Sequence, residues 1–170
     1  MRLLFFVCLA VVLSGCSRLT EFDIDYTSST TVPSSAGINL PFDVMTPDVT
    51  TNSETEFENN NTNKNLVDKI VLKKMTLTVH TPNNGNFGFL KSIEIFINAD
   101  GLSEKKIAWN NNVDSSAGAT IELTSSGDEL KEYVKSDKFK LRVNTVTDQL
   151  IAQDYTIDIY TLFTVNAKLL

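Results

Sequence analysis

Few residues of this sequence could act as a nucleophile, a general base or a soft metal ligand. His80 is the only histidine, and the only thiols are those of Cys8 and Cys16. Any Ser-His-Asp or Cys-His arrangement would therefore have to use His80. That histidine shares the polar side of a predicted strand with Thr76 and Thr78, and no Gly-x-Ser-x-Gly motif is present. We expect a solvated histidine, no catalytic residues and a protein that is not an enzyme.

The remaining candidates for chemistry are carboxylates and asparagines. One histidine without a free thiol cannot supply the usual zinc ligands, so we expect no metal site. Calcium stays open, because its oxygen ligands could come from Asp23, Asp25, Asp43, Asp48 and the asparagines between 59 and 65. Asp154 and Asp158 could in a cleft support glycoside hydrolysis, but we interpret them as the wet side of a strand. No glycine-rich phosphate loop occurs, and we expect no cofactor.

The residues before Cys16 indicate a different kind of chemistry. Met1-Arg2 gives a short positive start, and the next eleven residues, Leu3 to Leu13, are uncharged. That run is too short to span a membrane as a helix, which needs about 20 apolar residues. It has the length of the apolar region of a secretory signal peptide. The run ends in Leu13-Ser14-Gly15-Cys16.

This segment resembles the lipobox of bacterial lipoproteins, in which an aliphatic residue and two small residues precede the cysteine. The resemblance implies that residues 1–15 are a signal peptide and that the thiol of Cys16 takes the lipid, palmitate among its acyl chains. Leu13, Ser14 and Gly15 would be the residues that the signal peptidase recognises. Two or more acyl chains give stable membrane anchoring.

Ser17 and Arg18 follow the cysteine in place of acidic residues. In lipoproteins this implies anchoring to the outer membrane, with the protein facing the periplasm. Residues 16–20 would then form a short tether, and residues 21–170 are enough for one domain with a core. The net charge of −6 makes nucleic acid a poor partner. With Cys8 removed and Cys16 acylated, no disulfide can form, so packing must supply the stability.

Most of the domain sequence alternates between apolar and polar residues, as half-buried β-strands do. The final segment, Tyr155 to Leu169, keeps this alternation over fifteen residues, with only Thr161 interrupting the apolar side. At about 3.3 Å per residue it would span about 50 Å, so we expect a bend or a change of sheet near Thr161. The other alternating groups are Phe22/Ile24/Tyr26, Met75/Leu77/Val79, Ile93/Ile95/Ile97, Ile121/Leu123 and Phe139/Leu141/Val143.

Polar stretches predict the connections between these strands. Thr27 to Pro41 is rich in Ser, Thr and Pro, and Thr50 to Asn65 is rich in Asn, so both are predicted as loops. Phe57 is expected to hold the second loop against the core. Pro82-Asn83-Asn84-Gly85 and Asp100-Gly101 predict tight turns.

One short helix is predicted over Asp128–Lys135, with Ser126 or Asp128 as its N-terminal cap, and a helical turn over Asn65–Lys69. Six to eight strands with turn signals and little helix indicate an all-β fold. We predict a single antiparallel β-sandwich, immunoglobulin-like or similar, with one or two short helices. A small β-barrel is the alternative.

Aromatic side chains give the only sign of a binding surface. Phe96 and Tyr160 have the outward parity of their strands, and Trp109 precedes a turn of asparagines. Exposed aromatics can mark a partner surface, unless a second sheet or a loop covers them. Phe87 and Phe89 are expected to close one end of the core.

These features favour a lipid-anchored β-sandwich of the cell envelope that binds or scaffolds without catalysis. Its partners would be the membrane, through the N-terminal lipid, and an unknown protein or envelope component. Two alternatives remain open. The chain could be an assembly subunit whose strand 155–169 pairs with the sheet of another chain, or a carrier of an apolar ligand held between the sheets.

Overall fold

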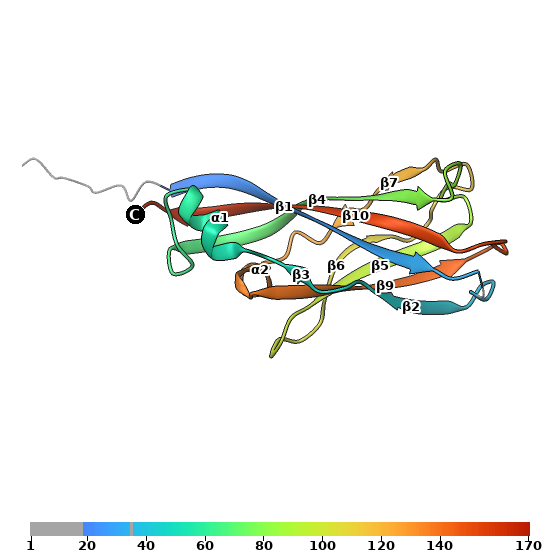
Figure 1. Cartoon of the computed structure of the whole chain (residues 1–170), viewed down its shortest axis with the longest axis horizontal. Helices are drawn as coiled ribbons and strands as arrows, with labels where there is room; N and C mark the ends of the chain where they lie inside the picture. The colour runs from blue at the N-terminus through green and yellow to red at the C-terminus, as the bar shows by residue number, and fades with distance from the viewer. Residues whose placement is uncertain (1–18, 35) are drawn as a thin grey trace, which may run out of the picture.

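A computed structural model of the chain describes residues 19–34 and 36–170, and it is a sandwich of two antiparallel sheets (Figure 1). The first sheet has the strand order β1 (Leu19–Val32), β10 (Tyr155–Lys168), β4 (Val67–Thr81) and β7 (Thr120–Glu122). The second has the order β2 (Pro41–Met45), β9 (Lys138–Thr147), β5 (Leu90–Asn98), β6 (Lys105–Asn110) and β8 (Thr124–Ser125), and β3 (Val49–Thr50) also pairs with β9. The predicted antiparallel sandwich is confirmed, and the sheets do not close into a barrel.

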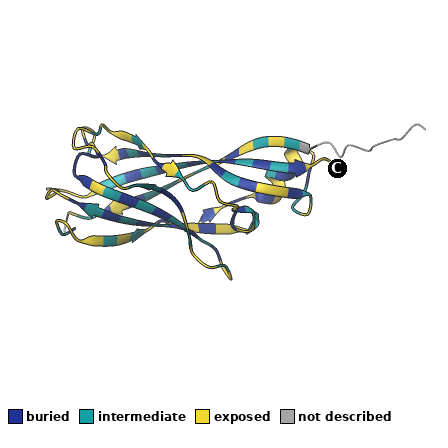
Figure 2. Ribbon diagram, turned by 180° about the vertical axis from the view of Figure 1, so that it is seen from behind, coloured by how far each residue is buried: buried dark blue, intermediate teal, exposed yellow. Residues whose placement is uncertain are grey.

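The alternation of apolar and polar residues places the core between the two sheets. Buried and partly exposed residues alternate along the long strands (Figure 2). The centre of the core is aromatic: the rings of Phe139 and Phe163 lie 6.3 Å apart, and Tyr26 lies edge-on to both. Residues 19–34 and 36–170 contain no cysteine, so this interdigitation of side chains supplies the stability of the sandwich.

Strand β10 crosses the whole molecule without changing sheet, so the expected change of sheet near Thr161 is wrong. The irregularity lies in the neighbouring strand β4. Leu162 opposes Lys74 but Phe163 opposes Leu72, which leaves Lys73 as a β-bulge. Thr161 is buried and donates a hydrogen bond to the carbonyl oxygen of Tyr26 at 3.1 Å, so its hydroxyl is satisfied inside the core.

Strand β1 is longer than its sequence predicts, and the predicted loop from Thr27 is wrong over its first part. Residues 27–32 continue the strand, with Thr30 and Val32 buried. The Ser and Thr residues are compatible with a strand because β10 supplies the pairing partners. At its other end, Leu19 and Thr20 pair with Lys168 and Ala167, so the fold begins inside the segment that we assigned to the tether.

The predicted loop over 50–65 contains helix α1 (Ser53–Asn59), which the sequence analysis missed. Phe57 is fully buried with its ring 6.3 Å from that of Phe22, so its predicted role in holding this segment is confirmed. Thr62, also fully buried, connects the segment to the end of β10. Its hydroxyl donates to the carbonyl oxygen of Lys168 at 2.6 Å.

The helix predicted over Asp128–Lys135 is present as the shorter α2 (Lys131–Lys135), in which Tyr133 and Val134 are buried, as is the preceding Leu130. The expected cap is wrong. The carboxylate of Glu129 instead accepts hydrogen bonds from the backbone N–H groups of Lys131 and Ile70, at 2.8 and 3.0 Å.

Both predicted turns are confirmed. Gly85 donates its backbone N–H to the carbonyl oxygen of Pro82 at 2.8 Å, and Gly101 has a φ of 78°. Phe87 and Phe89 are buried, and the ring of Phe89 lies 4.5 Å from that of Tyr155. Together these aromatic rings close one end of the core, as expected.

Candidate binding surface

Phe96 and Trp109 share the outer face of the six-stranded sheet. Phe96 lies in the middle of β5, between the buried residues Ile95 and Ile97, and Trp109 lies on the adjacent strand β6 beyond the buried Ala108. Because side chains alternate across a strand, both aromatics project away from the core. Each is half-buried by its neighbours on the face.

Tyr160 does not belong to this surface. It lies on β10 between Thr27 of β1 and Thr76 of β4, on the outer face of the four-stranded sheet. The structure therefore brings together two of the three aromatics that the sequence analysis selected, and it places the third on the opposite side of the sandwich.

Strand register organises the surface around Phe96 and Trp109 into two rows of neighbours. We call these residues the outer face cluster. One row runs Met45, Arg142, Phe96, Lys106, and the other runs Asp43, Asn144, Glu94, Trp109. Sequence alternation gave the outward parity of several of these residues. It could not give the register that makes them neighbours.

A cation lies over each aromatic ring of the outer face cluster. The guanidinium carbon of Arg142 is 4.0 Å from the ring centroid of Phe96, and the Nζ atom of Lys106 is 5.4 Å from that of Trp109. Such contacts are worth about 0.5–1 kcal/mol at exposed sites. Lys106 also binds the carboxylate of Glu94 at 3.0 Å. The Trp109 ring and the Glu94 carboxylate together therefore fix the position of its ammonium group.

Two carboxylates hold Arg142 in place over Phe96. Glu104 binds it through both oxygens, with Nε–Oε1 at 2.8 Å and Nη2–Oε2 at 2.7 Å, while Asp43 accepts from Nη1. The guanidinium keeps the pKa of Glu104 below its usual value. The Asn144 amide, together with Arg142, does the same for Asp43. In return, the Glu104 and Asp43 carboxylates raise the pKa of Arg142, so the guanidinium stays charged.

Replacing Glu104 with glutamine is expected to lower the free energy of unfolding at pH 7 by about 0.5–1 kcal/mol, because the bidentate ion pair is partly exposed. The pKa of Glu104 is lowered by folding, so the ion pair stabilises the protein above the unfolded pKa of about 4.3. That contribution is lost as the pH falls through the folded pKa. Urea unfolding at pH 7 and at about pH 3 checks this.

Glu122→Gln is the matched control, since its ion pair with Lys74 is monodentate and more exposed, at 3.3 Å. This variant should unfold almost as the parent protein does at both pH values. If Glu104→Gln lowers the free energy of unfolding by the same amount at pH 7 and at pH 3, the ion pair is not the cause of the destabilisation.

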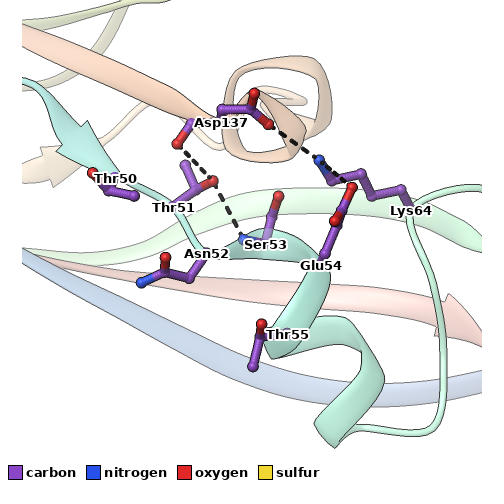
Figure 3. Close-up of a pocket in the computed structure, with 8 residues that line it drawn as sticks. All are labelled: Thr50, Thr51, Asn52, Ser53, Glu54, Thr55, Lys64 and Asp137. Atoms are coloured by element: carbon purple, nitrogen blue, oxygen red, sulfur yellow. Dashed lines mark hydrogen bonds and ion pairs between the residues drawn. The ribbon is translucent and has the colours of Figure 1, made fainter.

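A polar hollow of about 260 Å³ lies where α1 begins, lined by Thr50 to Thr55, Lys64 and Asp137. Figure 3 shows Lys64 reaching toward Glu54 and Asp137, whose carboxylates lie 3.4 and 3.5 Å from its Nζ atom. The hydroxyl of Thr51 donates to the carbonyl oxygen of Ser136 at 2.6 Å and accepts from the N–H of Ser53. These groups bond to one another and so connect the start of α1 to the start of β9. We therefore interpret the hollow as part of the packing between these two elements.

Strand β1 forms an edge of the four-stranded sheet, and an open groove of about 460 Å³ runs beside it. Residues 25–29 line one side and residues 47–50 the other. The hydroxyl of Tyr26, which lines this groove, donates to the carbonyl oxygen of Thr51 at 2.9 Å, and burial raises the pKa of the phenol.

Both edges of β10 are paired, one with β1 and the other with β4. The assembly hypothesis that used strand 155–169 as a pairing edge is therefore wrong. The carrier hypothesis also gains no support, because the hollows described above are open at the surface and lined mostly by polar residues, whereas buried aliphatic and aromatic side chains pack between the sheets.

Residues 19–34 and 36–170 contain no group of three or more His, Cys, Asp or Glu side chains placed to share a metal ion. The four aspartates among the candidate calcium ligands do not form such a group, and three of them bind cationic side chains. Asp23 binds Lys73 at 2.6 Å, Asp43 binds Arg142, and Asp48 binds Lys138 at 2.8 Å. Asp25 lies on β1 and lines the groove beside that strand together with Asp48, but the two carboxylates belong to no group of three.

His80 has the exposed position that its strand parity predicts, with its Nδ1 atom 3.1 Å from the carboxylate of Asp158. Asp154 accepts a hydrogen bond from the backbone N–H of Ser34 at 2.8 Å.

Neither helix of the described part is long and apolar enough to cross a membrane. The predicted lipidation and cleavage residues, Cys16 and Leu13, Ser14 and Gly15, lie outside the described residues.

Comparisons with known proteins identify no family for this chain. No family model matches it, and no curated protein matches it. Among solved structures it is similar to a chain titled Desmodium yellow mottle tymovirus, with 11% sequence identity over 89% of this chain and 90% of that chain. The TM-score is 0.30, and at that value the similarity supports no conclusion about function.

Proposed function

We propose that this protein is anchored by lipid on Cys16 to the outer membrane, on its periplasmic side, and binds a protein or envelope partner there without catalysing a reaction. The observation that carries the proposal is the sequence Leu13-Ser14-Gly15-Cys16 at the end of an eleven-residue uncharged run. Strand β1 begins at Leu19, two residues beyond Ser17 in the sequence. A lipid on Cys16 would therefore tether the sandwich without interrupting a strand.

The outer face cluster is the surface that we assign to the partner. Its residue types support this, because Trp, Phe, Met and Arg are enriched where protein interfaces are buried. Met45 is 49% exposed, at the end of the row that contains Arg142 and Phe96. Glu104 and Asp43 already hold the side chain of Arg142 in one position. Binding of a partner would therefore cost little conformational entropy of this side chain.

Crosslinking in intact cells tests the assignment. We expect a protein partner to crosslink to the full-length protein from a photoreactive residue in place of the exposed Met45. Trp109→Ala should reduce the crosslinked product about tenfold, the loss typical of one interface residue worth about 1.4 kcal/mol.

Tyr160→Ala is the control, since it removes a half-buried aromatic from the opposite face. It should leave the product unchanged. Equal crosslinking in the two variants would contradict the assignment of the outer face cluster. The absence of any crosslinked protein would contradict the binding function itself.

A further inference from the structure

Two exposed leucines lie at the end of the sandwich where the fold begins. Leu169 is 40% exposed and Leu170 is 80% exposed. Lys168, just before them, is the pairing partner of Leu19, the first residue of β1. In Figure 1 the C-terminus, α1 and the start of β1 lie together at one end of the long molecule.

Hydrogen bonds hold these leucines in a defined position. The backbone N–H of Leu170 donates to the carbonyl oxygen of Asn61 at 3.0 Å, and that of Lys168 donates to the carbonyl oxygen of Leu66 at 2.9 Å. The buried Thr62 binds the carbonyl oxygen of Lys168 from the same loop. The apolar side chains therefore project from a folded end of the molecule.

The length of chain before β1 limits how far this end can be from the anchor. Two residues lie between Cys16 and Leu19, so three residue-to-residue steps join them and span at most about 11 Å. Leu19 and Lys168 are neighbours across a strand pair, about 5 Å apart. The polar interface of a bilayer is itself about 5–7 Å thick on each side, so the leucines come within reach of it.

We infer that this end of the sandwich faces the bilayer and that Leu169 and Leu170 insert into its interface. The inference rests on the proposed lipid anchor, and it names a phospholipid surface as what covers the two leucines. Strand β1 has fourteen residues and spans about 46 Å. The turn at Pro82 to Gly85 lies at the other end of the molecule, so it extends away from the membrane.

Site-specific fluorescence on the lipidated protein tests the orientation. The mature chain would carry no free thiol, so a single introduced cysteine can be labelled with an environment-sensitive dye. Asn65→Cys puts the label beside Leu66 at the membrane-facing end, and Asn84→Cys puts it in the distant turn. Both positions are exposed. The proteins are reconstituted into vesicles of phosphatidylethanolamine and phosphatidylglycerol with brominated acyl chains.

We expect the label at residue 65 to be quenched at least about twofold more than the label at residue 84, because interfacial elements reach about 5–10 Å into the headgroup region. Replacing both leucines with serine should remove most of that difference. Equal quenching at the two positions in vesicle-bound, acylated protein would overturn the inference and leave the anchor standing. Unchanged quenching in the serine variant would overturn the role of the leucines. An intact mass without acyl chains would overturn the anchor and the inference together.

Discussion

Substituting Cys16 with serine is expected to move the protein from the membrane fraction to the soluble fraction, or to leave it as an uncleaved precursor. In the proposed anchor the thiol of Cys16 takes the lipid, and the hydroxyl of serine would not replace it. Each acyl chain contributes roughly 0.8 kcal/mol per buried CH₂. The loss of two or more chains therefore removes more than about 10 kcal/mol of membrane binding, which should abolish anchoring completely. Fractionation and immunoblotting of both proteins measure this.

Cys8→Ser is the matched control, since it changes the other cysteine, which lies inside the uncharged run. It should leave the protein in the membrane fraction. If Cys16→Ser also stays membrane-bound with the mobility of the mature protein, lipid on Cys16 is not what anchors it.

Replacing Phe163 with alanine is expected to destabilise the fold by about 3–5 kcal/mol, the usual cost of emptying a buried aromatic position. The ring is fully buried at the centre of β10, with its centroid 6.1 Å from that of Tyr26 and 6.3 Å from that of Phe139. Both sheets contribute to this contact, so the cavity cannot close without moving one sheet toward the other. Urea unfolding followed by circular dichroism gives the change.

Phe163→Leu keeps most of the volume and should cost about 1–1.5 kcal/mol. Equal losses in the leucine and alanine variants would indicate that the aromatic contacts between the sheets do not determine the stability at this position.

Alternation of residues predicted the fold class and most of the core. Met75, Ile95, Leu141 and Ile159 are buried, as their parity requires, because one face of each sheet must pack against the other. The short helix around Tyr133 and the turn at Gly101 also followed from local signals, since the side chains that determine them are adjacent in sequence.

The errors came where tertiary contacts override local composition. Residues 27–32 have the composition of a loop but form a strand, because β10 offers a complete partner. Helix α1 lies in a segment rich in polar residues, and the burial of Phe57 holds it in place. The first backbone N–H of α2 binds the carboxylate of Glu129, which also binds the backbone of β4 at Ile70. That arrangement depends on a strand that lies 59 residues away in the sequence.

The candidate surface was predictable in part. The alternation of apolar and polar residues predicted that Phe96 faces outward. Trp109 was a candidate because it precedes a turn of asparagines. The contact between Phe96 and Arg142, and the separation of both from Tyr160, depend on which strand lies beside which. Strand order and register across two sheets are set by long-range pairing, which a single sequence does not encode locally.

The most direct test of the account is the intact mass of the protein purified from bacterial membranes with its native signal. We predict a chain that begins at Cys16 and is heavier than the polypeptide by one diacylglycerol, with or without a further acyl chain on the amino group. Fragmentation should place the added mass on residue 16. A chain that begins elsewhere, or one that begins at Cys16 without added mass, would contradict the lipid anchor and the function that depends on it.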